Sequence, residues 1–567
     1  MQRTLSLTII LLISLVAVNA RVRTASPAPV RGAHGMVVST SPIASEVGIE
    51  IMKKGGNAVD AAVAVGFALA VTHPSAGNIG GGGFLVFHDA PSGESFTYDY
   101  REMAPARADR NMYVDEAGEI VPERSTVGHL SAGVPGTVAG LLLALEKHGR
   151  LVPQTVLAPA IRLAEEGFPV SYALSQSFEA AAPLLSRFPE SRRIFLRNGN
   201  YFEEGEILVQ KELGATLRLI SKLGAAGFYE GTVAALVAQE MRNGGGFITE
   251  DDMKNYRAVE REPIVANYRG HTIVSMGPPS SGGVILSEML NMVEPEDLSY
   301  LGRNSSRYVH LLAEVMKRAF ADRAHYLGDA DFSSVPFHGL ISKEYAHKRR
   351  ADINPDRTTL ASDLGPGDPL PFESEDTTHF SVVDREGNAV ANTYTLNGGY
   401  GSGITVPGAG FLLNNEMDDF SSKPGVANQY GLIQGEANSI GPRKRPLSAM
   451  TPTIVLKDGR VLLVTGSPGG PTIINTVFQI VLNVIDHELN VQEAVDSPRF
   501  HHQWLPDVLR YEEHGLVRDV EETLRARGHA LAPGTSIGDA HSIYVDPETE
   551  IRFGAADPRM DGKAVGY

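Results

Sequence analysis

Hydrophobic residues in the first two thirds of the chain recur mainly at the three- and four-residue spacing of an α-helix. The clearest such segments are followed closely by glycine or by the pair His73-Pro74, which end helices. The Ala/Val-rich segment that Asn57 can cap is apolar on nearly every face, so we expect it to be buried. Helices are predicted at 43–54, between Asn57 and His73, and at 135–147, 152–166 and 306–327.

The last third of the chain changes to the alternating pattern of strands. Predicted strands cover 377–384, 389–396, 451–456 and 461–465, with short ones near Ser542 and Ile551, and a long apolar helix covers 473–485. The glycine-rich stretch 75–84 leads into a further strand-like segment. Helices followed by paired strands and again by helices predict an α/β (α+β) fold, with sheets between helical layers.

The first twenty residues have the pattern of a targeting segment. Arg3 precedes an apolar run from Leu5 to Val18, and Val18-Asn19-Ala20 offers small residues for cleavage. The run is short for a membrane span, although retention as an uncleaved anchor is the alternative. We expect residues 1–20 to be a signal peptide. The mature protein is then exported without a membrane anchor, to the periplasm or, alternatively, outside the cell.

Composition restricts the function further. A net charge of -17 disfavours a nucleic-acid or anionic-membrane surface, while leaving room for a local cationic pocket. There is no cysteine, which excludes disulfides, thiolate nucleophiles and cysteine metal sites. His501 and His502 are adjacent and cannot present both rings to one metal from a helix face, so no metal is assigned.

One junction has the composition of a self-cleavage site. Residues 363–376 carry three prolines, two glycines and five carboxylates, which predicts an exposed, extended segment. A predicted strand begins directly afterwards, at Thr377. Cleavage between Asp376 and Thr377 would leave a terminal threonine whose hydroxyl is a nucleophile and whose amine is a base.

The next strand offers partners to that threonine. If Arg385-Glu386-Gly387 is a three-residue hairpin loop, pairing symmetric about Glu386 places Thr395 opposite Thr377 and Asn397 just beyond it. The alternative is that these threonines only reflect the preference of strands for β-branched residues.

Two further clusters suggest a binding site for an amino acid. Glu416 and Asp419 can bind an ammonium group, and Arg101 can bind a carboxylate with two parallel hydrogen bonds. The alternatives are a solvated turn or a calcium-like loop for the acids, whose spacing does not fit such a loop, and a surface charge for Arg101.

Glycine-rich turns raise two more interpretations. Gly469 and Gly470 lie between a predicted strand and helix, where backbone amides can stabilise an oxyanion. A phosphate loop is disfavoured because no Lys-Ser/Thr pair follows. The pattern Gly534-Thr-Ser536-Ile-Gly538 fits a nucleophile elbow, but too little chain follows it to supply a triad, so we expect a turn.

Taken together, these motifs resemble those of the γ-glutamyltranspeptidase (glutathione hydrolase) family. The resemblance spans nearly the whole mature chain. It rests on motifs that begin at Asn78, Pro278, Thr377, Asn414, Arg445, Gly466 and Asp557.

The resemblance implies a four-layer αββα sandwich of the N-terminal nucleophile hydrolase type. It implies autocleavage after Asp376, giving a heterodimer of a large subunit (21–376) and a small subunit (377–567). The residues it matches to family roles are the nucleophile Thr377 with its supporting hydroxyl Thr395, Asn397, Glu416 and Asp419 at the amino group, Arg101 and Ser448 at the α-carboxylate, Gly469 and Gly470 at the oxyanion, and Tyr430 on a lid loop that covers residues 421–431.

The implied reaction passes through a γ-glutamyl ester on Thr377. Donors are glutathione and related γ-glutamyl compounds, the acyl group goes to water or to an amino acid or peptide, and no cofactor is needed. Ala449 departs from the two adjacent serines common in relatives, which predicts weaker binding of the α-carboxylate. The alternatives are a β-lactam side-chain acylase of the same fold and a non-catalytic exported binding protein.

Overall fold

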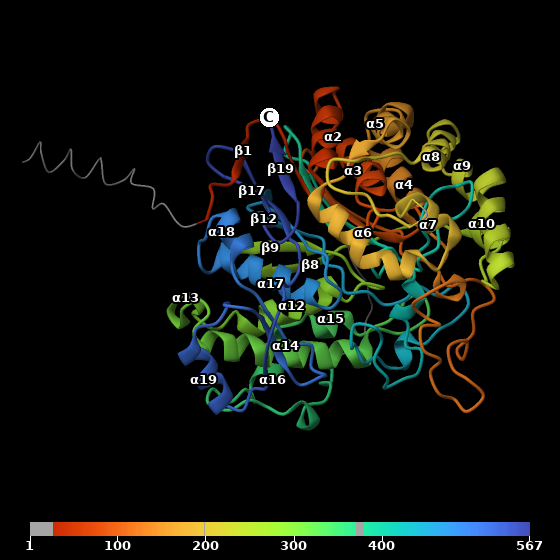
Figure 1. The fold of residues 1–567 in the computed structure, drawn as a ribbon. Coiled ribbons are helices and arrows are strands. Elements are labelled where there is room, and N and C mark those ends of the chain that lie inside the picture. Colours follow the sequence, from red (N-terminus) through yellow and green to blue (C-terminus); the bar gives the residue numbers. More distant parts are fainter. Residues whose placement is uncertain (1–25, 198, 370–378) are drawn as a thin grey trace, which may run out of the picture.

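The computed structural model describes residues 26–197, 199–369 and 379–567, and its centre is formed by two seven-stranded antiparallel sheets (Figure 1). The order of the first sheet is β1 (Val30–Gly32), β18 (Arg552–Ala556), β17 (His541–Val545), β13 (Arg460–Thr465), β12 (Thr453–Lys457), β9 (His271–Ser275) and β8 (Ile264–Tyr268). The order of the second sheet is β19 (Lys563–Gly566), β2 (Met36–Ser39), β10 (Phe380–Val383), β11 (Ala389–Thr395), β3 (Gly82–Asp89), β4 (Glu94–Asp99) and β7 (Val259–Arg261).

Two small sheets and a large set of helices complete the fold. The small sheets are β14 (Phe500–His501) with β15 (Leu509–Glu512) and β16 (Leu531–Gly534), and β5 (Phe168–Pro169) with β6 (Ile207–Leu208). The helices are α2 (Pro42–Lys53), α3 (Ala58–Thr72), α4 (Thr137–His148), α5 (Pro153–Glu166), α6 (Tyr172–Leu185), α7 (Pro189–Phe195), α8 (Lys211–Leu223), α9 (Ala226–Tyr229), α10 (Gly231–Gly244), α11 (Glu250–Asn255), α12 (Gly282–Val293), α13 (Leu298–Leu301), α14 (Ser306–Tyr326), α15 (Phe337–Leu340), α16 (Lys343–Arg350), α17 (Thr472–Ile485), α18 (Val491–Asp496) and α19 (Arg518–Ala526).

The sheets pack face to face, and helices cover their outer faces. The core between the sheets includes Val38 and Val86 from the second sheet and Val274 and Val464 from the first. Helices α2, α3 and α4 pack on the second sheet, while α12 and α18 pack on the first, with α14 and α17 beside them (Figure 1). The predicted αββα sandwich is confirmed.

The helices predicted from apolar spacing are all present, with ends that agree within two residues. Helix α3 begins as the sequence indicates: the Asn57 side chain accepts hydrogen bonds from the amides of Val59 and Asp60, and the Asp60 carboxylate accepts one from the amide of Asn57. Every residue of this helix is buried, as its uniformly apolar faces predict.

Other elements were not predicted. Helices α6 to α11 fill the region between residues 172 and 255, but α6 contains Pro183 and α10 begins at Gly231, residues that normally interrupt helices. Strands β8 and β9 and helix α12 were not assigned either.

The hairpin of β10 and β11 has the predicted register. Phe380 pairs with Asn392 and Val383 with Ala389, which is symmetric about Glu386. Gly387 has φ +89°, the left-handed conformation expected where such a loop closes. Asp376 and Thr377 lie outside the described residues, so the pairing of Thr377 with Thr395 stays a prediction.

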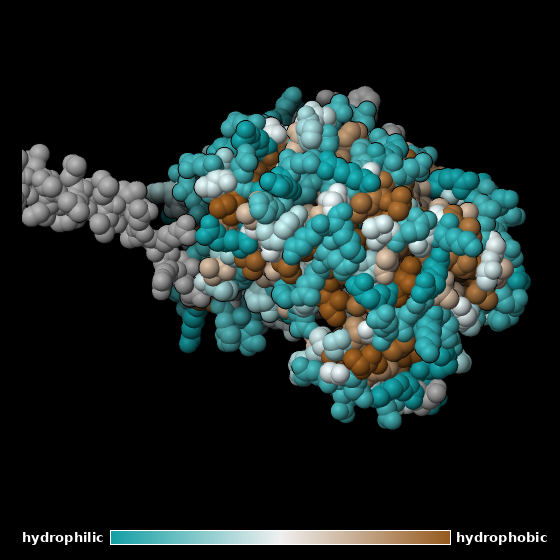
Figure 2. Space-filling model, turned by 90° about the horizontal axis from the view of Figure 1, so that it is seen from above, coloured by the Kyte–Doolittle hydropathy of each residue, from teal (hydrophilic) through white to brown (hydrophobic). Residues whose placement is uncertain are grey.

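The face seen in Figure 2 is largely hydrophilic, with apolar residues in small groups. No helix in the described part of the chain is long and apolar enough to cross a bilayer. The predicted signal peptide, residues 1–20, lies outside that part.

Candidate active site

A cavity of about 400 Å³ lies where the end of β11, the β13–α17 loop and the lid loop meet. It brings together most of the residues predicted from sequence. Those that line it are Thr395, Asn397, Glu416, Asp419, Tyr430, Ser448, Gly469 and Gly470. Of the three others, Asp376 and Thr377 lie outside the described residues, and Arg101 lies behind the wall, fully buried.

Arg101 holds the acidic end of the cavity together. Its Nη2 donates to Oδ2 of Asp419 at 2.7 Å, its Nη1 pairs with Oε1 of Glu416, and its Nε donates to the carbonyl oxygen of Pro446 at 3.1 Å. Glu102 lies 3.6 Å from Nη1. The structure therefore confirms the proximity of Arg101, Glu416 and Asp419, while Arg101 faces protein carboxylates and not the cavity.

Three carboxylates, those of Glu102, Glu416 and Asp419, lie around the single guanidinium of Arg101. Burial raises the pKa of Glu416 and of Asp419 against the opposing effect of Arg101, and it raises the pKa of Glu102 to about 7. Among the described residues nothing hydrogen-bonds Oε2 of Glu416, a buried atom on a residue that lines the cavity. This end of the cavity can therefore accept a cation that donates hydrogen bonds.

Asn397 lies beside the acids in an unusual backbone conformation. Its φ is +74°, a left-handed value that asparagine tolerates better than most residues. Its amide donates to Oγ1 of Thr395 at 2.9 Å, and its Nδ2 donates to the carbonyl oxygen of Asn415 at 3.1 Å. These bonds fix the side chain at the point where β11 ends.

A second guanidinium lines the cavity, and it carried no signal in the sequence. Arg323 on α14 is buried, donates from Nε to Oγ of Ser281 at 2.8 Å, and donates from Nη2 to the carbonyl oxygen of Ser448 at 3.3 Å. Ser281 also donates to that carbonyl, at 2.7 Å. Because charged residues on a long helix usually face solvent, only the structure could place Arg323 beside Ser448 and Ala449.

The glycine turn and the lid meet across the cavity. Gly469 and Gly470 have φ values of +133° and +56°, and they precede α17 directly. The Tyr430 ring packs over Gly470, where an added Cβ would lie 3.1 Å from it, and its hydroxyl donates to the carbonyl oxygen of Asn397 at 2.7 Å. Tyr430 thus spans from the predicted oxyanion turn to the head-group residues.

The lid is tied to the acid cluster by residues that the sequence did not indicate. Asn428 donates from Nδ2 to Oδ1 of Asp419 at 3.3 Å, and the amide of Gln429 donates to Oδ2 of Asp418 at 3.1 Å. The position of the lid is therefore coupled to the carboxylates that it covers.

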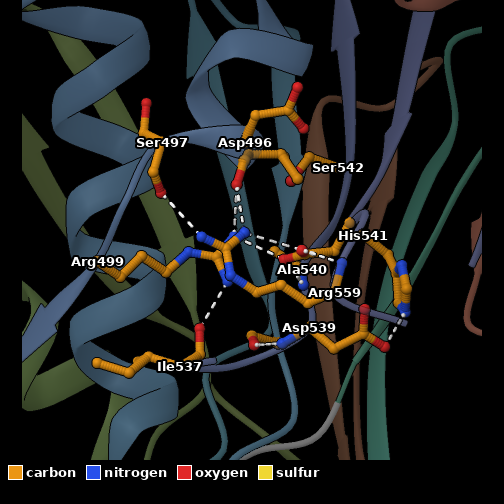
Figure 3. Close-up of polar contacts among 12 residues, drawn as sticks. Asp496, Ser497, Arg499, Ile537, Asp539, Ala540, His541, Ser542 and Arg559 are labelled. Carbon is orange, nitrogen blue, oxygen red and sulfur yellow. Dashed lines mark hydrogen bonds and ion pairs between the residues drawn. The ribbon is translucent and has the colours of Figure 1, made fainter. Parts of the chain in front are cut away.

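A wall of histidine and aspartate lines another part of the cavity. His541 and Asp539 lie 3.2 Å apart, and Nε2 of His379 lies 2.6 Å from Oγ of Ser381. Burial lowers the pKa of His379 well below its usual value, so the ring is neutral at ordinary pH. Figure 3 shows the segment from Ile537 to Ser542, which carries Asp539 and His541, beside Arg499. Arg499 donates to the carbonyl oxygen of Ile537 at 2.7 Å and so holds this segment in place.

The remaining motifs do not form sites. Ser536 is exposed in the irregular loop that follows β16, so the pattern does not form a nucleophile elbow, although the segment is a strand end and a loop and not the predicted turn. His501 and His502 point to different partners, Asn475 and Asp507 respectively. No cluster of three or more potential ligands suited to a metal occurs among the described residues.

Comparisons with known proteins agree with this geometry. A family profile described as gamma-glutamyltranspeptidase matches residues 44–567. The glutathione hydrolase proenzyme of Escherichia coli (strain K12) is 49% identical over 541 residues, 95% of this chain and 93% of that protein. A solved cephalosporin acylase from Bacillus halodurans superposes with a TM-score of 0.86 at 27% identity over 97% of this chain and 98% of that one. For the Helicobacter pylori γ-glutamyltranspeptidase, the TM-score is 0.57 at 46% identity over 61% and 97%. The chain belongs to the γ-glutamyltranspeptidase family.

Proposed function

We propose that the protein is an autoprocessing γ-glutamyltransferase that also hydrolyses glutathione. One observation carries the proposal: Glu416, whose buried Oε2 has no hydrogen-bond partner among the described residues, lines a cavity together with Asp419 and Asn397. An ammonium group can donate three hydrogen bonds, and it brings positive charge to an end of the cavity where carboxylates are in surplus.

The opposite charge of the head group has a place nearby. Ser448 and Arg323 line the same cavity, and Arg101 lies directly behind Asp419. An α-carboxylate beside Ser448 accepts from its hydroxyl and is stabilised by the guanidinium of Arg323, while Arg101 remains paired with the acids behind the wall. The pocket thus suits the amino-acid end of a γ-glutamyl compound such as glutathione.

The chemistry follows from a terminal threonine. An α-amine has a pKa of about 8, so near neutral pH part of it is a free base. It takes the proton of the Thr377 hydroxyl while the oxygen bonds to the γ-carbonyl carbon, and the amides of Gly469 and Gly470 stabilise the oxyanion. The C–N bond then breaks, the leaving nitrogen takes the proton, and a γ-glutamyl ester remains.

The ester is resolved by water or by an amine. The attacking group bonds to the ester carbon and gives its proton to the terminal amine, which then protonates the departing Thr377 oxygen. Water gives hydrolysis, and an amino acid or peptide gives transpeptidation. No step calls for a cofactor or a metal.

Maturation uses the same hydroxyl. Attack on the carbonyl carbon of Asp376 converts the peptide bond to an ester, and hydrolysis of that ester separates the subunits 21–376 and 377–567. Removal of residues 1–20 during export, to the periplasm by preference, precedes the mature heterodimer.

The acylase alternative differs at the head group. A β-lactam acylase whose substrate side chain carries no amino group has no need of two buried carboxylates beside the cavity. Glu416 and Asp419 therefore favour a γ-glutamyl donor. A non-catalytic binding protein would leave the chain uncut.

Gel electrophoresis with a γ-glutamyl anilide assay tests the proposal. The wild type should give two bands and release the aniline product, while Thr377→Ala gives one band and no product. Thr378→Ala, with the neighbouring threonine changed, should still be cleaved. Cleavage of Thr377→Ala, or an uncut wild type, would refute autoprocessing at this bond.

A further inference from the structure

A second cavity opens from the active-site cavity, away from the head-group residues. It has a volume of about 180 Å³. The two cavities share five lining residues, Thr40, His73, Ser75, Ser177 and Met560. None of the predicted head-group residues lines the second cavity.

Apolar side chains form one part of the walls of this second cavity. Helices α2 and α6 and strand β5 supply most of them, namely Pro42, Ile43, Phe168, Pro169, Ala173 and Leu174, and Met560 adds another. The remaining lining residues are polar, and Asp561 is the one carboxylate among them. Phe168 and Leu174 are buried in the core cluster that includes α3, so this part of the wall is fixed. An apolar cavity of about 150 Å³ is large enough to admit benzene.

The position of the shared residues determines which part of a substrate reaches this cavity. With the amino-acid end of the donor at Glu416 and Asp419, the γ-carbonyl separates that end from the amine of the amide. In a ping-pong reaction the leaving amine and the incoming acceptor amine occupy the same side of the acyl group. Since none of the head-group residues lines the second cavity, the amine end is the part of the substrate left to reach it.

We propose that the second cavity is a side-chain subsite for the acyl acceptor, and that it selects amines with an apolar or aromatic side chain. This inference rests on the proposed function. The walls at the shared residues are themselves held in place: the Ser177 hydroxyl lies 2.8 Å from the Tyr400 hydroxyl, and the amide of Tyr400 donates to the carbonyl oxygen of Ser75 at 2.9 Å. A preformed pocket binds without a cost for ordering its walls.

The experiment compares acceptors that differ only in side chain. Glycinamide and phenylalaninamide carry the same charge, and burying a phenyl ring favours the second by about tenfold or more in kcat/KM for transfer. Filling the cavity with Ala173→Phe should reduce this ratio to near one. Ala180→Phe is the matched control, because Ala180 is exposed on the same helix and lines neither cavity.

Glutamine hydrolysis separates failure of the subsite from failure of the proposed function. Its leaving group is ammonia, which does not reach the second cavity, so its rate should be unchanged in both variants. An unchanged acceptor ratio in a folded Ala173→Phe that still hydrolyses glutamine overturns the subsite. Absence of glutamine hydrolysis in the wild type overturns the function itself.

A second variant tests the proposal even if Ala173→Phe does not fold. Leu174→Ala enlarges the cavity, and it should shift the preference from phenylalaninamide toward tryptophanamide. A preference that does not change in this variant also contradicts the proposal.

Discussion

The substitution Ala449→Ser tests the recognition of the donor carboxylate. Ala449 lines the cavity next to Ser448 and is 6% exposed. A hydrogen bond to a charged group contributes about 1.5–3 kcal/mol, which corresponds to about tenfold to a hundredfold in kcat/KM. We expect the lower end, because the added hydroxyl loses its hydration and rotamer freedom in the cavity.

The assay is release of aniline product from a γ-glutamyl anilide, with kcat/KM as the measured quantity. This ratio reports the acylation step from free enzyme and substrate. A 4-aminobutyryl anilide, which keeps the amine of the γ-glutamyl group but lacks its α-carboxylate, should show no gain in Ala449→Ser. Ser448→Ala is the matched control, and it should lower kcat/KM for the γ-glutamyl substrate by a similar factor.

An unchanged kcat/KM in a folded Ala449→Ser refutes the idea that a missing hydroxyl weakens binding. Arg323 then becomes the explanation, because it lines the same cavity beside Ser448 and its charge can replace a hydroxyl contact. Arg323→Gln should in that case weaken the γ-glutamyl substrate much more than the aminobutyryl one. Equal losses on both substrates would indicate only a structural role for Arg323.

Three other substitutions probe the site. Burial raises the pKa of Glu102 to about 7, so its negative charge, which favours a substrate ammonium, appears as pH rises through 7. Donor kcat/KM should therefore rise less between pH 6 and 8 in Glu102→Gln than in the wild type. An identical pH profile would contradict this. Tyr430→Phe removes the bond to the Asn397 carbonyl, which should lower kcat/KM by about tenfold at nearly unchanged thermal stability; unaltered kinetics would exclude a role for the hydroxyl. Thr395→Val removes the acceptor for the Asn397 amide and should reduce donor turnover at least tenfold while hardly changing side-chain volume; full turnover would show that this hydroxyl is dispensable.

The local parts of the site were predictable because local sequence determines them. The loop at Gly387 sets the register of β10 and β11 by itself, and that register carries Thr395 and Asn397 to the end of the strand. The turn at Gly469 and Gly470 was readable for the same reason, since it joins a clear strand to a clear helix.

The long-range parts were not predictable from pattern alone. Arg323 lies on a helix whose charges carry no sign of burial, yet its side chain reaches a loop more than a hundred residues away. The pairing of Arg101 with Glu416 depends on the packing of β3, β4 and the 414–420 segment, which no spacing rule describes. The helices between residues 172 and 255 were missed because prolines and glycines interrupt their pattern.

The ion pairs that Arg101 makes without substrate affect how the pocket discriminates between γ-glutamyl donors and other compounds. Arg101 already neutralises part of the charge of Glu416 and Asp419, much as a bound head group would. A zwitterionic substrate therefore replaces existing charge contacts as well as adding new ones, and the net gain in free energy is the difference between two large terms. A substrate that lacks one pole leaves a buried charge without its new partner, which costs about 3–5 kcal/mol. The difference in binding free energy between a zwitterionic donor and one that lacks a pole should consequently exceed the net binding free energy of the zwitterion itself. Because Glu102 adds a further carboxylate, loss of the ammonium group should cost more than loss of the carboxylate.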